Sequence, residues 1–170
     1  MNKKFKKYPS FGDSKRTHDY AGNVVPKNSE YVILMGKIDF IKAGIQIANS
    51  YLSKTEHKEM LNFLSRKLWQ TMGELSLGKI GKKVSDPVSQ EDIKQVEHWI
   101  DTFKVPDSFV EFTKKKAVYL NDARTRWRQI EPELISYGEK YPLRNEIYSF
   151  FNRAGDLLFL LACYYENEKD

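Results

Sequence analysis

The chain has 170 residues, of which 41% are hydrophobic, and its net charge is +5. This length suits one compact domain with a substantial core, so no second folded domain is expected. The single cysteine, Cys163, excludes an intramolecular disulfide and a cysteine-rich metal site, and it is typical of a protein from a reducing compartment.

Membrane-spanning and secretory segments are not expected. The longest apolar run, residues 157–165, is far shorter than the roughly 20 residues that span a bilayer. The N-terminus also lacks the apolar core of a signal peptide. We therefore expect a soluble, cytoplasmic protein that does not bind membranes.

The N-terminal tail is strongly basic, with Lys3, Lys4, Lys6 and Lys7 next to aromatic residues. A basic segment of this kind can contact nucleic acid. No folded nucleic-acid-binding motif follows it, so we interpret it as a solvated terminus and do not expect a nucleic-acid partner.

Helical periodicity begins at Ser29, and no segment from there onward shows the alternation of a strand. The first predicted helix is apolar on more than one side and carries Asp39, a carboxylate that in such a setting needs a cationic partner or a large pKa shift. The second is predicted to run from a capping box at Ser53 and Glu56 to Gly78, with apolar residues at spacings of three and four.

The middle of the chain contains a predicted loop and a third helix. Residues 76–89 are rich in glycine and lysine, which is typical of a loop. Ser89 and Asp92 predict the start of the helix, and the sequence "KVPD" at residues 104–107 predicts its end.

A fourth helix is predicted to begin near Asp107 or Ser108, with a kink at Pro132, and a fifth follows Pro142. Together the segments predict an all-α protein, a five-helix antiparallel bundle over residues 29–170. Because the first and fifth helices are apolar nearly all round, a monomer would expose too much of them, so we expect an oligomer.

Polar residues interrupt the apolar fifth helix in "FFNRAGDLLFLLACYY", residues 150–165. Asn152 and Asp156 are four apart and share a face, while Arg153 and Asp156 are three apart and can pair. A charged stripe on the helix surface is the plain alternative to a functional site here.

In the fourth helix, Arg124 and Arg128 share a face, and Glu131 follows near them. Two guanidinium groups at this spacing form a fork suited to phosphate oxygens, although helix arginines are usually only solvated.

The histidines show no catalytic or metal-binding pattern. His18, His57 and His98 are isolated, so we interpret them as surface or capping residues and expect no metal site. No serine or cysteine nucleophile motif is present either.

Six segments carry a longer pattern, in this order: "GDSKRTHDYAGNVVPK", "GKIDFIKAGIQIA", "LWQTMGELS", "VSQEDIKQVEHWID", "ARTRWRQIE" and "FFNRAGDLLFLLACYY". In order and spacing they resemble the PduO-type ATP:cob(I)alamin adenosyltransferases, a family of trimeric five-helix bundles. The resemblance covers most of the chain.

The resemblance implies an enzyme that transfers the 5′-deoxyadenosyl group of ATP to cob(I)alamin and releases triphosphate. It implies ATP and Mg²⁺ as cofactors, cobalamin as a substrate, a homotrimer, and a flavoprotein reductase as a further partner. Residues 1–28 would then combine the basic tail with a segment that resembles the family's nucleotide loop.

The resemblance also implies site residues. Asp39 and Arg128 match an ion pair in the family and are the implied catalytic residues, while Phe109 matches an aromatic that presses on the lower corrin face, with Asp156 also on the corrinoid side. The residues implied to bind ATP are Gly12, Asp13, Thr17, Lys27, Arg124, Arg128, Glu131 and Asn152.

The chain departs from the family pattern at several positions. Lys15 and Arg16 replace small residues of the nucleotide loop, and Gln129 and Pro132 replace two arginines of the fourth helix. Two alternatives to an active enzyme therefore stay open: a non-catalytic paralogue that binds a nucleotide or corrinoid, and a trimeric helical scaffold without a ligand.

Overall fold

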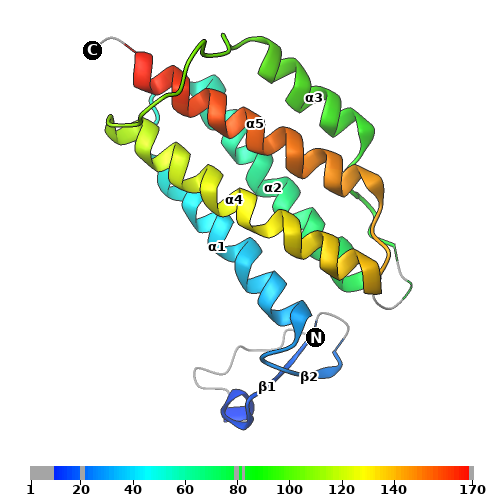
Figure 1. Cartoon of the computed structure of the whole chain (residues 1–170). Coiled ribbons are helices and arrows are strands. Elements are labelled where there is room, and N and C mark those ends of the chain that lie inside the picture. The colour runs from blue at the N-terminus through cyan, green and yellow to red at the C-terminus, as the bar shows by residue number, and fades with distance from the viewer. Residues whose placement is uncertain (1–9, 20–21, 79–80, 82, 169–170) are drawn as a thin grey trace.

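The computed structural model describes residues 10–19, 22–78, 81 and 83–168, so the lysine-rich tail lies outside the described residues. The described chain is a bundle of five helices with a small hairpin at one end (Figure 1). The helices are α1 (Glu30–Tyr51), α2 (Thr55–Gly78), α3 (Gln90–Asp101), α4 (Lys115–Lys140) and α5 (Asn145–Asn167). The predicted five-helix architecture is confirmed, and none of the described helices is long and apolar enough to cross a membrane.

A short hairpin precedes the bundle and was not predicted. After a 3-10 turn at Ser10–Ser14, the antiparallel strands β1 (Arg16–His18) and β2 (Val24–Pro26) pair with Thr17 opposite Val25. Each strand has three residues, which is too short for an alternating pattern to show in the sequence. The hairpin lies at the N-terminal end of α1 (Figure 1).

The helix neighbours establish the antiparallel arrangement. Glu30, at the start of α1, pairs with Lys140 at the end of α4, and Tyr51 at the end of α1 stacks on Tyr119 near the start of α4. α4 also packs on α5, where the indole of Trp127 donates a 2.8 Å hydrogen bond to a backbone carbonyl. α3 packs against α5 as well.

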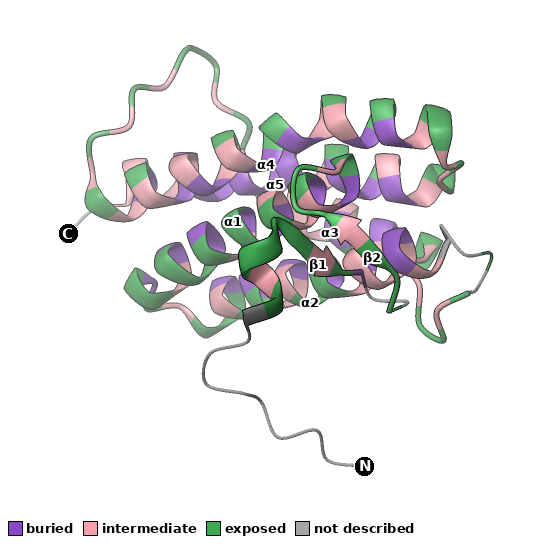
Figure 2. Ribbon diagram, turned by 90° about the horizontal axis from the view of Figure 1, so that it is seen from below, coloured by how far each residue is buried: buried purple, intermediate pink, exposed green. Residues whose placement is uncertain are grey.

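The core is centred on α5, of which twelve residues are buried, from Ile147 to Tyr165 (Figure 2). α5 contacts α2, α3 and α4, so these neighbours cover its apolar circumference. The expectation that a monomer would expose α5 is therefore wrong. α1 does expose apolar side chains, at Ile33, Phe40 and Ile47.

The fourth helix begins at Lys115, so the start predicted at residues 107–108 is wrong. Residues 102–114 instead form an irregular segment. The backbone N–H groups of Thr113 and Lys114, just before α4, bond to the Glu166 carboxylate of α5. α4 then continues through Pro132 without a break.

The other helix starts agree more closely with prediction. α2 begins with a hydrogen bond from the Lys58 N–H to the Lys54 carbonyl, so its N-cap is one residue after the predicted Ser53. The capping box of Ser89 and Asp92 at the start of α3 is confirmed.

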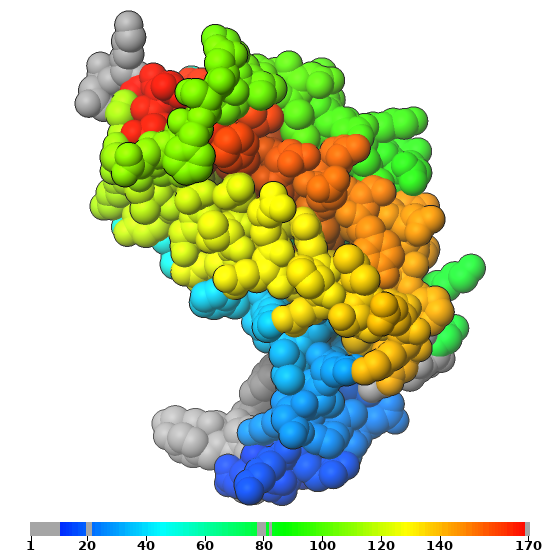
Figure 3. Space-filling view, in the orientation of Figure 1, coloured from blue at the N-terminus to red at the C-terminus, as the bar shows by residue number. Residues whose placement is uncertain are grey.

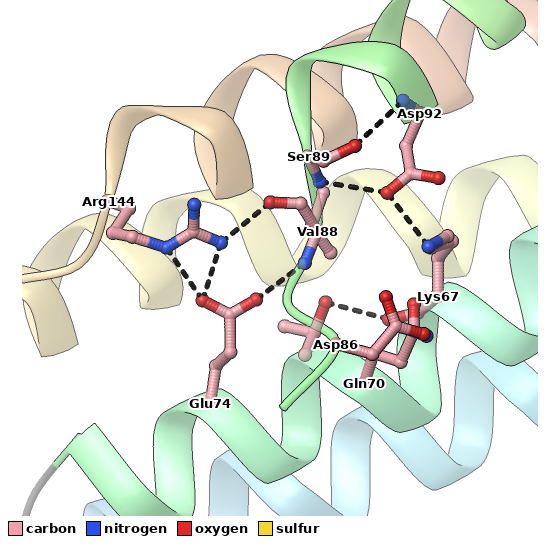
Figure 4. A network of polar contacts seen from close by, with 9 residues as sticks. Lys67, Gln70, Glu74, Asp86, Val88, Ser89, Asp92 and Arg144 are labelled. Carbon is pink, nitrogen blue, oxygen red and sulfur yellow. Dashed lines mark hydrogen bonds and ion pairs between the residues drawn. The ribbon is translucent and has the colours of Figure 1, made fainter. Parts of the chain in front are cut away.

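The connection between α2 and α3 is fixed by polar contacts (Figure 4). Glu74 of α2 accepts a 2.8 Å hydrogen bond from the Val88 N–H and pairs with Arg144, which precedes α5. Arg144 also donates to the Val88 carbonyl. The described part of the predicted loop is therefore irregular in conformation but held to two helices.

Candidate functional site

The arginines of α4 lie against α5. The guanidinium of Arg124 lies 5.1 Å from the ring centroid of Phe159 on α5, and it donates a 3.0 Å hydrogen bond to Asn121. Burial lowers the pKa of Arg124, and the nearby Arg128 acts in the same direction, while Asp156 of α5 opposes them. The two arginines and Asp156 are therefore close enough to interact electrostatically.

Glu131 extends this cluster along α4. Its carboxylate lies 3.8 Å from where a Cβ on Gly155 would stand, which places it against α5. Asn152, Gly155 and Asp156 share a helix face, and both polar side chains of that face are exposed. The predicted polar faces of the fourth and fifth helices thus meet.

Arg153 belongs to a different contact. Its guanidinium donates a 3.0 Å hydrogen bond to Glu97 of α3, whereas its distance to Asp156 is 4.0 Å. The predicted Arg153 pair with Asp156 is present, but the shorter contact holds α3 to α5.

A large cavity of about 1130 Å³ opens at one end of the bundle. It lies where the start of α2 and the segment of residues 102–114 meet the end of α5. Its lining combines aromatic and acidic side chains. Among the lining residues are Glu56, His57, Trp99, Phe103, Phe109, Cys163, Tyr164 and Glu166.

Phe109 stands at this cavity with 95% of its surface exposed. The other phenylalanines of the segment are packed: Phe103 contacts Tyr164, and Phe112 meets Phe159 edge-on with 6.2 Å between ring centroids. The Arg124 guanidinium also lies over the Phe159 ring. Residues 102–114, the cavity segment, and the arginine cluster of Arg124 and Arg128 therefore share Phe159 as a neighbour on α5. An aromatic as exposed as Phe109 is free to contact a ligand.

His57 is a cavity residue that the sequence interpretation missed. It is buried, with its Nδ1 atom 2.9 Å from the Tyr165 hydroxyl and its Nε2 atom 3.4 Å from Glu56. Burial lowers its pKa. The interpretation of His57 as a surface or capping residue is wrong; its position four residues before the buried Leu61, on the same apolar stripe, was the available signal.

The nucleotide-loop residues form a compact turn around the hairpin. The Lys27 ammonium lies 3.1 Å from where a Cβ on Gly12 would stand, and the Lys27 N–H bonds to the Lys15 carbonyl at 3.0 Å. Lys15 has φ 58°, the left-handed conformation that favours glycine. Thr17 lies in β1 and Asp13 is exposed on the turn before it. The loop therefore keeps a glycine-like backbone although a lysine stands there.

The nucleotide loop and residues 102–114, which include Phe109, are at opposite ends of the molecule (Figure 3). The hairpin adjoins the start of α1, whereas the Phe109 segment lies beyond the other end, where Tyr51 stacks on Tyr119. The 22 residues of α1 separate these ends by about 33 Å. One chain therefore does not bring Gly12 and Phe109 into a single site.

Asp39 and Arg128 also remain apart within one chain. Both side chains are exposed, and no ion pair joins them in the described residues. The apolar setting inferred for Asp39 is therefore wrong for the isolated chain, because Asp39 lies on the outer side of α1. A pair across an interface stays a prediction.

The described residues include no group of three histidine, cysteine or acidic side chains arranged to hold a metal ion.

Comparison with known sequences gives a consistent result. A family profile described as "Cobalamin adenosyltransferase" matches residues 7–165. A corrinoid adenosyltransferase from Citrobacter freundii is 24% identical over 169 residues, which is 96% of each protein. The corrinoid adenosyltransferase PduO from the same organism is 27% identical over 161 residues, or 91% of this chain, which spans only 48% of that relative.

Solved structures share the fold. A variant of a PduO-type ATP:corrinoid adenosyltransferase from Lactobacillus reuteri, complexed with cobalamin and ATP, aligns with a TM-score of 0.83 at 19% identity, covering 95% of this chain and 93% of that one. Another variant of that protein, complexed with ATP, aligns with a TM-score of 0.81 at 19% identity, covering 94% and 93%.

Proposed function

This chain belongs to the cobalamin adenosyltransferase family, and on that premise we propose that it transfers the 5′-deoxyadenosyl group of ATP to cob(I)alamin and releases triphosphate. The observation that carries the proposal is that Arg124 and residues 102–114 both contact Phe159 of α5. Arg124 rests on Phe159, and Phe159 contacts Phe112 of the segment that presents Phe109. A cationic surface for polyphosphate is thereby joined to an aromatic cavity for a corrinoid.

In the proposed reaction, the cobalt of cob(I)alamin attacks the 5′ carbon of ATP. A cobalt–carbon bond forms while the bond from this carbon to the triphosphate oxygen breaks, and its electron pair leaves with triphosphate. The nucleophile already carries an electron pair, so no general base is required. The protein then contributes by orienting the two substrates and by stabilising the charge on the leaving group.

The site residues divide between the two substrates. Lys27, Arg124 and Arg128 supply positive charge for the triphosphate. Gly12 leaves room for the Lys27 ammonium over the loop, and Asn152 offers an amide to the nucleotide. Asp13, Thr17 and Glu131 complete the ATP side.

Phe109 is the proposed corrinoid contact. Its exposed ring would press on the lower corrin face and keep an axial ligand from the cobalt, and Asp156 would shape the boundary between corrinoid and nucleotide. Arg128 would also pair with Asp39 of another copy, as the family resemblance implies.

Mg²⁺ belongs to this proposal as the partner of ATP. Mg²⁺ is commonly held by substrate phosphates and water with only one or two carboxylates. That mode suits the described residues, which lack a cluster of three metal-binding side chains. Bound there, Mg²⁺ would neutralise part of the polyphosphate charge.

We further propose a cytoplasmic homotrimer whose corrinoid substrate is brought to the cobalt(I) state by an electron from a flavoprotein reductase. Ile33, Phe40 and Ile47 are exposed at intervals of seven on α1, which gives an apolar line for a second copy to cover. A site that uses both Gly12 and Phe109 needs two chains, since one chain separates them. Sedimentation that shows a stable monomer near 20.0 kDa would contradict this assembly.

The activity is tested by incubating the protein with Mg²⁺-ATP and chemically reduced cobalamin while the corrinoid spectrum is followed. Adenosylcobalamin formed in proportion to enzyme supports the proposal. Binding of either substrate without turnover would identify the non-catalytic paralogue, and absence of binding would identify the scaffold.

A further inference from the structure

We propose that Glu166, at the end of α5, is a positioning residue that holds residues 102–114, and with them Phe109, at the cavity by capping α4 from a separate helix. The inference rests on the proposed function, because that function makes Phe109 the corrinoid contact. It adds a residue with a distinct task to the corrinoid side of the site.

The Glu166 carboxylate is fully engaged at the start of α4. It accepts hydrogen bonds from the Thr113 N–H at 2.8 Å, the Thr113 hydroxyl at 2.7 Å and the Lys114 N–H at 3.0 Å. Lys114 is the N-cap of α4 and makes no side-chain cap of its own. The Glu166 carboxylate therefore binds the N–H of the N-cap residue itself, as the acidic residue at N3 does in a capping box, although it comes from α5.

Helix electrostatics agree with this role. A carboxylate in the last turn of α5 is unfavourable for α5 itself, whose last turn contains no basic residue, but it is favourable beside the N-terminus of α4. Partial burial acts to raise the pKa of Glu166, yet the hydrogen bonds from Thr113 and Lys114 outweigh it and lower the pKa below its usual value. Glu166 is therefore ionised at neutral pH.

Phe109 depends on this contact because its own side chain has no packing. It is 95% exposed, so its position is determined by the backbone on either side. Upstream, Phe103 packs on His57 and Tyr164. Downstream, Phe112 packs on Phe159, and Thr113 follows at once with its bonds to Glu166. Releasing Thr113 leaves the downstream side of Phe109 held by the Phe112 contact alone.

The test compares Glu166→Gln with Glu168→Gln. Glu168 lies two residues further on and pairs with Lys116 at 3.1 Å, so its replacement removes the same charge without touching the backbone cap. Each protein, saturated with Mg²⁺-ATP, is titrated with cob(II)alamin while the visible spectrum reports loss of the lower axial ligand.

We expect Glu166→Gln to bind cob(II)alamin about tenfold more weakly, because the binding-competent arrangement of the segment would be populated about a tenth as often. Glu168→Gln should stay close to the wild type, and the ATP affinity of both variants should be unchanged. An unaltered cob(II)alamin affinity in Glu166→Gln would overturn the positioning role of Glu166 but would leave the proposed function intact. A wild-type protein that leaves the cob(II)alamin spectrum unchanged would overturn the proposed function together with it.

A second variant separates positioning from helix stability. Adding Lys114→Ser to Glu166→Gln gives α4 a local side-chain cap without a link to α5. We expect this double variant to regain thermal stability but not cob(II)alamin affinity. Recovery of both would show that Glu166 only stabilises the helix, which would overturn the positioning role.

Discussion

The ammonium group of Lys67 on α2 lies 2.8 Å from the carboxylate of Asp92 on α3, with only 9% and 14% of the two side chains exposed. Asp92 also accepts a hydrogen bond from the Ser89 N–H in the capping box (Figure 4). Loss of one partner leaves a charge in a largely dry environment.

We expect Lys67→Met to lower the free energy of unfolding by about 3 kcal/mol, because it leaves the Asp92 carboxylate without its cation. This value is at the lower end of the range for a broken buried pair, since Asp92 keeps its hydrogen bond from Ser89. Chemical denaturation measures this change. Lys104→Met is the control, since Lys104 and Asp107 are 86% and 88% exposed and their pair should contribute almost nothing. Similar losses in the two variants would mean that the Lys67 pair is effectively solvated.

Stability should fall on acidification because of His57. Burial lowers its pKa below the usual 6.5, and Lys54 acts in the same direction, while Glu56 and Glu168 oppose both. His57 in the unfolded chain therefore binds a proton at a higher pH than His57 in the folded chain does. The free energy of unfolding starts to decrease as the pH drops through about 6.5, and it continues to decrease until His57 of the folded chain is also protonated.

Denaturant titrations between about pH 7.5 and pH 5 test this pH dependence. The His57→Gln variant should be less stable at the upper pH, because it loses the Tyr165 contact, but its stability should fall less steeply with acid. Parallel curves for wild type and variant would assign the acid sensitivity to other groups.

Phe109→Ala should separate function from folding. Because Phe109 is 95% exposed, its truncation should change the free energy of unfolding by no more than about 0.5 kcal/mol. ATP affinity should stay nearly unchanged, while turnover with cob(II)alamin and a reductase should weaken. Phe112→Ala, which removes a packed ring, should destabilise the fold, and an unchanged turnover rate in Phe109→Ala would count against the corrinoid assignment.

Asp39 and Arg128 should matter to assembly and not to the isolated chain. Both are exposed, so Asp39→Asn and Arg128→Met should leave the fold of one chain intact. If they pair across a desolvated interface, each change should weaken association by about 3 to 5 kcal/mol, and the double variant should recover part of the loss. Sedimentation of the four proteins measures this, and simple additivity would show that the residues do not touch.

Gly12→Ala tests the nucleotide loop. A Cβ at this position would stand 3.1 Å from the Lys27 ammonium and displace it. We expect weaker ATP binding by calorimetry with little change in unfolding, because the loop lies outside the core. Gly36→Ala is the control, since a Cβ there meets nothing within 4 Å. Equal ATP affinities would remove Lys27 from the phosphate site.

The sequence predicted those features that depend on residues close together in the chain. The helical stripes, the Ser89 capping box and the shared faces of Arg124 with Arg128 and of Asn152 with Asp156 all follow from spacings of three or four. Such spacings determine which residues share a face before any tertiary contact forms.

The features that the sequence did not predict depend on distant residues. The start of α4 was misplaced because its cap comes from Glu166, 53 residues from Thr113. The burial of α5 was misjudged because periodicity does not reveal how many helices surround it. The cavity beside Phe109 likewise forms only when α2, α5 and residues 102–114 meet.

The central position of α5 has a consequence for synthesis on the ribosome. α1 to α4 precede α5 in the chain, yet α4 and α3 both bury apolar surface against it. In a nascent chain that ends before residue 145, the apolar faces of α3 and α4 that pack on α5 are therefore exposed, and the core is incomplete. Such an intermediate is a substrate for chaperones that hold emerging chains, and a translational pause before α5 should favour aggregation.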